Sequence, residues 1–112
     1  MTLKLNRAAL LLPRVETMID WYFGEKINAA IGPLGALHAR KRALAEDAAD
    51  NPLIGSADDR AAILARAAEQ DAAIAKLDSE RRAMKAKARA ATSSTALQAI
   101  LADIERLATS DI

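Results

Sequence analysis

Apolar residues recur at helical spacing along most of this 112-residue chain. In the first clear segment, Val15, Ile19 and Phe23 repeat every fourth residue and define one broad helical face. A second clear stripe near the end of the chain contains Leu97, Ile100, Leu101, Ile104 and Leu107. The full pattern predicts helices at residues 14–31, 36–49, 57–91 and 95–109.

Breaks between these segments carry Gly, Pro or Ser, and cap residues begin two of the helices. Ser56 is expected to cap the third helix, and Thr95 with Gln98 has the spacing of a capping box for the fourth. The start of the chain is ambiguous, because Pro13 either kinks a longer helix or occupies the first turn of a new one. Residues 1–13 are therefore expected to form an arm or a short helix.

These elements predict an all-α fold, a single helical domain over residues 1–112 built as a bundle of about four helices. Alanine is the commonest residue, with 28 copies, so a hydrophobic content of 52% overstates the volume available for a core. Such a composition suits closely packed helices and does not suit sheets. The core is thin, and association with another chain would add to it.

The third helix is predicted to be long and coiled-coil-like, with about 35 residues and a length of roughly 50 Å. Apolar and small residues recur on one side of this helix every three or four positions over about four heptads. Two polar residues, Gln70 and Arg81, interrupt the pattern. This seam, a candidate for self-association, consists of Ile63, Ala67, Gln70, Ile74, Leu77 and Met84. Two interpretations stay open: the central helix of a monomeric bundle, or a helix paired with a second copy.

All three aromatic residues of the chain are consecutive, at Trp21, Tyr22 and Phe23. Three consecutive helical side chains spread over about 200°, so they cannot share one core face. Tyr22 and Phe23 fall on the apolar face, whereas Trp21 falls among polar neighbours. Trp21 is either covered elsewhere in the fold or, as a common anchor of protein interfaces, available to a partner.

Residues 81–89 carry five positive charges and no negative one. We define the basic stripe as the four residues that share about 100° of the helix, Arg81, Arg82, Lys85 and Arg89. Acids of the same chain could neutralise it, and the candidates are Glu46, Asp47, Asp50, Asp103 and Glu105. An acidic protein partner or the phosphates of a nucleic acid could also do so, although the near balance of 16 basic and 15 acidic residues argues against a strongly nucleic-acid-binding chain.

No pattern of catalytic or metal-binding residues stands out. The chain has no Cys and one His, and it lacks the phosphate-binding, nucleophile-elbow and zinc-binding motifs. Glu16 and Asp20 are spaced like residues that share a helix face, but no histidine accompanies them as in a di-iron bundle. We therefore expect no enzyme activity, no cofactor and no metal. The longest run of large apolar residues is too short for a membrane span, which predicts a cytoplasmic protein with no membrane contact.

The function predicted from these features is a non-enzymatic helical protein–protein interaction or assembly module, an adaptor or structural accessory protein. It would bind another protein or a second copy through Trp21 and the basic stripe, and small accessory or inhibitor proteins of bacteria and phages fit this description. The alternative is a nucleic-acid-associated protein that contacts phosphates through residues 81–89.

Overall fold

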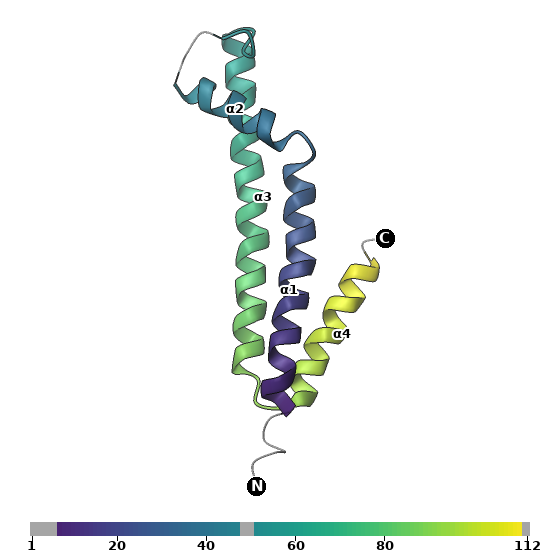
Figure 1. The fold of residues 1–112 in the computed structure, drawn as a ribbon. Coiled ribbons are helices and arrows are strands. Elements are labelled where there is room, and N and C mark those ends of the chain that lie inside the picture. The colour runs from purple at the N-terminus through teal and green to yellow at the C-terminus, as the bar shows by residue number, and fades with distance from the viewer. Residues whose placement is uncertain (1–6, 48–50, 111–112) are drawn as a thin grey trace. The chain divides into compact units, whose positions relative to one another are not determined.

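The computed structural model describes residues 7–47 and 51–110, and these fold entirely into helices and connecting turns. The described residues contain four helices and no strand: α1 (Arg7–Ile31), α2 (Gly35–Glu46), α3 (Ala57–Ala90) and α4 (Ser94–Ser110) (Figure 1). The all-α prediction with one long helix is confirmed, since α3 has 34 residues. None of the helices in this part of the chain is long and apolar enough to span a bilayer.

The chain divides into two compact units. The three-helix unit combines residues 1–26 with residues 77–112, and the α2 unit comprises residues 27–76. The single domain expected over the whole chain stays a prediction.

Helix α1 begins earlier than the sequence pattern predicts, at Arg7 and not at residue 14. Pro13 lies inside it, so the possibility that Pro13 opens a new helix is wrong. Proline removes one backbone donor there, and the Thr17 hydroxyl donates to the Pro13 carbonyl at 2.9 Å. Residues 7–13 of the expected arm are thus the start of α1, while residues 1–6 lie outside the described residues.

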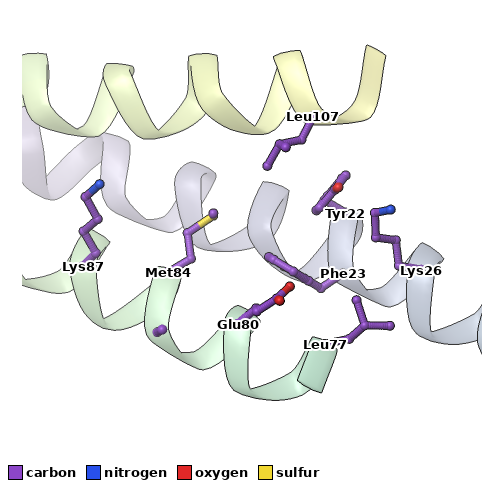
Figure 2. Close-up of a pocket in the computed structure, with 9 residues that line it drawn as sticks. Tyr22, Phe23, Lys26, Leu77, Glu80, Met84, Lys87 and Leu107 are labelled. Carbon is purple, nitrogen blue, oxygen red and sulfur yellow. The ribbon is translucent and has the colours of Figure 1, made fainter. Parts of the chain in front are cut away.

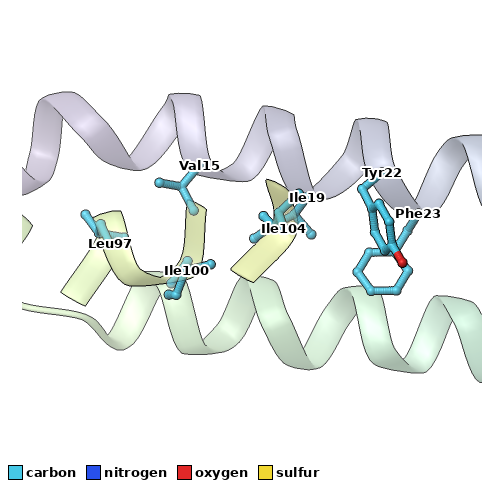
Figure 3. Close-up of a cluster of buried hydrophobic side chains, with 8 residues drawn as sticks. Val15, Ile19, Tyr22, Phe23, Leu97, Ile100 and Ile104 are labelled. Atoms are coloured by element: carbon cyan, nitrogen blue, oxygen red, sulfur yellow. The ribbon is translucent and has the colours of Figure 1, made fainter. Parts of the chain in front are cut away.

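The core of the three-helix unit is a single cluster of buried side chains contributed by three helices (Figure 3). Its members are Val15, Ile19, Tyr22 and Phe23 of α1, Ala88 of α3, and Leu97, Ile100 and Ile104 of α4. The two apolar stripes predicted from the sequence supply seven of these eight residues. Ala88 is fully buried, and its small side chain allows a close approach of the helices around it.

The ends of α4 and α1 use local hydrogen bonds. Ser93, and not the predicted Thr95, caps α4, because its hydroxyl oxygen accepts from the Ala96 N–H at 3.1 Å. Gly32 follows the end of α1 with a φ of +79°, a left-handed conformation that suits glycine, and its N–H donates to the Asn28 carbonyl.

Side-chain hydrogen bonds to the backbone mark both helix ends in the α2 unit. Arg60, near the start of α3, donates to the carbonyl oxygens of Leu44 and Ala45 at 3.1 and 3.0 Å, which satisfies the last turn of α2. Ser56 caps α3 as predicted, since its hydroxyl oxygen accepts from the Asp59 N–H at 3.1 Å. Leu44 and Ala45 are the buried residues of α2.

Replacement of Ile104 by Ala tests whether this cluster stabilises the three-helix unit. Ile104 is fully buried, so Ile104→Ala should lower the free energy of unfolding by about 2–5 kcal/mol. Leu34→Ala serves as a control, because Leu34 is 55% exposed, and it should change the stability by less than about 1 kcal/mol. Urea denaturation followed by circular dichroism measures both values. Equal losses would show that the cluster is not the main source of stability.

Candidate functional site

The three consecutive aromatic residues of α1 divide between the core and the surface. Tyr22 and Phe23 are buried, with ring centroids 5.0 Å apart in an edge-to-face arrangement at 82°. Trp21 is 52% exposed. The chain thus leaves its largest side chain half in water and buries its two smaller aromatic side chains.

A second large apolar residue, Leu10, lies on the same side of α1 as Trp21. The two are eleven residues apart, which places them within about 20° on the helix and about 16 Å along its axis. We define the outer α1 face as Leu10, Arg14, Thr17 and Trp21, all four of which are exposed. The sequence reading did not include Leu10, although its spacing from Trp21 was a usable signal.

Two acids of α1 meet the basic stripe of α3. Asp20 accepts from Lys85 and from Arg81, with a distance of 2.9 Å in each pair, and Glu16 pairs with Arg89. We define the ion-pair ladder as these contacts of Glu16 and Asp20 with Arg81, Lys85 and Arg89. The order of the pairs shows that α1 and α3 run antiparallel within this unit (Figure 1).

The ladder continues on α3 itself through Asp78. Its carboxylate oxygens lie 2.9 Å from an Arg81 nitrogen and 3.0 Å from an Arg82 nitrogen. All four cations of the basic stripe therefore have a carboxylate partner within the chain. Arg82 and Arg89 remain largely exposed, whereas the Lys85 side chain is only 17% exposed.

These contacts shift the pKa values of the acids. The hydrogen bond from Lys85, supported by Arg81, holds the pKa of Asp20 below its ordinary value. The pKa of Asp78 is likewise lowered, chiefly by its hydrogen bond with Arg81. In turn, Asp78 and then Asp20 raise the pKa of Arg81, so each of these three groups favours its charged form.

Among the described residues, the acids predicted as partners, Glu46, Asp47, Asp103 and Glu105, are not those that pair with the stripe. Glu46 pairs with Arg42 at 2.9 Å, and Asp103 pairs with Arg106 at 3.0 Å, each within its own helix. Asp50 lies outside the described residues. The sequence did contain a signal for the correct partners, because Glu16 and Asp20 share the four-residue spacing of Arg81, Lys85 and Arg89.

The predicted seam of α3 coincides with partly covered positions of that helix. Its six residues, Ile63, Ala67, Gln70, Ile74, Leu77 and Met84, are all half-buried in the single chain. Leu77 and Met84 pack against the buried cluster, and the Gln70 amide donates to the Ala30 carbonyl at 3.0 Å. Self-association through the seam stays a prediction, but one chain already covers part of it.

A hollow of about 490 Å³ lies between α1, α3 and α4 in the three-helix unit (Figure 2). Its lining combines apolar side chains, such as Met84 and Leu107, with the charged Lys26, Glu80 and Lys87. Tyr22 and Phe23 also line it but are 7% and 3% exposed, so they offer little contact area to a ligand. In area of exposed aromatic surface, Trp21 is the stronger candidate.

Comparison with family models, with curated proteins and with solved structures finds no match. Within residues 7–47 and 51–110, no group of three or more His, Cys, Asp or Glu residues is arranged to hold a metal ion. The candidate site is thus a helix face that carries Trp21, next to a set of charges that neutralise one another.

Replacement of Asp20 by Asn tests the ladder through its pH dependence. The folded-state pKa of Asp20 is lowered, so its ion pairs stabilise the fold above the unfolded-state pKa of about 4 and are lost as the pH falls through the folded-state value. Asp20→Asn should therefore cost about 1 kcal/mol at pH 7 and clearly less near pH 2. Urea denaturation at both pH values measures the difference.

Asp103→Asn is the matched control, because Asp103 pairs with Arg106 only within the exposed surface of α4. It should change the stability little at either pH. A loss for Asp20→Asn that is equally large at both pH values would mean that the ion pairs are not its cause.

Proposed function

We propose that this chain is a non-enzymatic protein–protein interaction module whose contact surface is the outer α1 face, with Trp21 as its anchor. The single observation that carries the proposal is the exposure of Trp21 beside two aromatic residues that are buried. A half-exposed tryptophan is unusual in a chain whose apolar residues are so largely alanine. Tryptophan is also among the residues most enriched at the energetic centres of interfaces.

The surroundings of Trp21 support the same role. Its neighbour Asp20 is held by Lys85 and Arg81, and its other neighbour Tyr22 is packed in the core. Contacts on both sides fix the rotation of α1 about its axis, so the indole is presented from a rigid helix. A preorganised anchor loses little conformational entropy on binding.

The nucleic-acid alternative has less support. It depends on the basic stripe, whose four cations pair with Asp20, Glu16 and Asp78. Contact with phosphates would have to compete with these carboxylates. We therefore assign the stripe the role of positioning α1. Contacts of Arg82 and Arg89 with an acidic partner would be a secondary role.

Site-specific photo-crosslinking tests the proposal. Benzoylphenylalanine at position 21 should give a discrete covalent adduct in cells of the source organism, because an interface residue lies against its partner. The same probe at position 106 is the control, since the Arg106 side chain is 71% exposed on α4, outside the proposed surface. Denaturing electrophoresis and mass spectrometry read out both positions.

An adduct at position 21 and none at position 106 supports the interaction module. Absence of any adduct at position 21 contradicts it. Circular dichroism of Trp21→Ala supplies a check on folding, and helix content should match that of the unchanged chain because the side chain is not part of the core.

A further inference from the structure

The outer α1 face carries a charge arrangement that complements itself. Arg7 and Glu25 are both exposed, and each lies about 60° from the line of Leu10, on the same flank of α1. They stand at opposite ends of the face, eighteen residues apart in the sequence, or about 27 Å along the helix. A helix with opposite charges at the two ends of one flank matches a copy of itself that runs the other way.

Antiparallel pairing brings the apolar residues into the same register as the charges. In an antiparallel pair, the numbers of any two residues at the same level add up to a constant. When Leu10 of one copy is level with Trp21 of the other, this sum is 31. Arg7 then lies within one residue of the level of Glu25 in the partner copy. In an antiparallel helix pair each flank faces the same flank of its partner, so the two residues face one another, twice by symmetry.

A second observation points to an acid at the start of α1. The positive end of a helix favours acidic residues, yet the first turn of α1 contains none and begins with Arg7. A carboxylate from another chain beside Arg7 would offset this unfavourable charge. Parallel pairing offers no such match, since it sets Trp21 against Trp21 and leaves the two Arg7 residues at the same end.

We infer that the partner of the outer α1 face is a second copy of this chain, bound through α1 in an antiparallel, two-fold symmetric pair. This inference rests on the proposed function and names its partner. Leu10 and Trp21 supply the apolar contact, and Arg7 and Glu25 fix the direction and register of the two helices.

Charge reversal in a double-mutant cycle tests the pair. Arg7→Glu and Glu25→Arg each replace two attractive contacts by two repulsive ones, so each should weaken the dimer about tenfold. The combined variant restores opposite charges and should return the dissociation constant to within about threefold of the original. Sedimentation equilibrium at low salt, over micromolar to millimolar concentrations, measures each constant.

Two reversals outside the proposed interface serve as controls. Arg66→Glu on α3 and Glu105→Arg on α4 change exposed charges of the same kinds and should leave the dissociation constant unchanged. Circular dichroism establishes that each variant keeps its helix content. A chain that stays monomeric at the highest concentration, or a double variant weakened as much as the single ones, overturns the antiparallel pair.

The same register predicts one substitution that strengthens the dimer. It places the Arg14 residues of the two copies about 4.5 Å apart along the helix direction. Both lie close to the two-fold symmetry axis of the pair and on the same flank. Their repulsion opposes association, so Arg14→Gln should tighten the dimer about threefold. An unchanged or weaker dimer would contradict this register.

The crosslinking experiment separates failure of this inference from failure of the proposed function. An adduct at position 21 with twice the mass of the chain supports the symmetric pair. An adduct with any other protein overturns the pair, but the interaction module stands. Absence of both an adduct and a dimer removes both proposals.

Discussion

The three-helix unit depends on the packing of α1 against two different kinds of neighbour. Val15 and Ile19 pack into an apolar cluster with α4, while Glu16 and Asp20, the residues that follow them, pair with cations of α3. Hydrophobic burial in this eight-residue cluster is not directional, so by itself it does not fix the rotation of α1 about its axis. The ion pairs add directional contacts that apolar packing lacks, and the two together fix which residues of α1 face outward.

These ion pairs change the interpretation of the basic stripe. Five positive charges within nine residues suggest an external anion when the sequence is considered alone. In the folded chain Lys85 is largely covered and shares Asp20 with Arg81, so these charges act first as structural contacts. In the proposed interface their main contribution is indirect, since their ion pairs with Asp20 and Glu16 fix the rotation of α1 and hence the position of Trp21.

Much of the fold could be predicted from the sequence because it depends on local periodicity. The apolar stripes of α1 and α4 were sufficient to identify seven of the eight residues in the buried cluster, and the seam of α3 matched its half-buried positions. Ends of helices were harder, because several residues around Ser93 can each act as a cap and proline is tolerated inside α1 where it faces water.

The partners of the charges could not be predicted in the same way. Which acid meets Arg81 depends on which helix lies beside α3 and in what direction, and periodicity within one helix carries no such information. Asp103 was among the acids predicted to pair with the stripe, whereas Glu16, which does pair with it, was not. Helix geometry predicted that Trp21 lies off the apolar face, but its exposure became known only from the fold. Leu10 joins the same face because α1 begins as early as Arg7.

The position of the single tryptophan also decides what its fluorescence can report. In most small proteins, tryptophan emission follows the loss of the core on unfolding. Here the only indole is half in water in the folded chain, so its emission should differ little between the folded and unfolded states. The emission should respond instead to anything that covers the outer α1 face, so it can report binding there without an added label. Folding is then better followed through helix content.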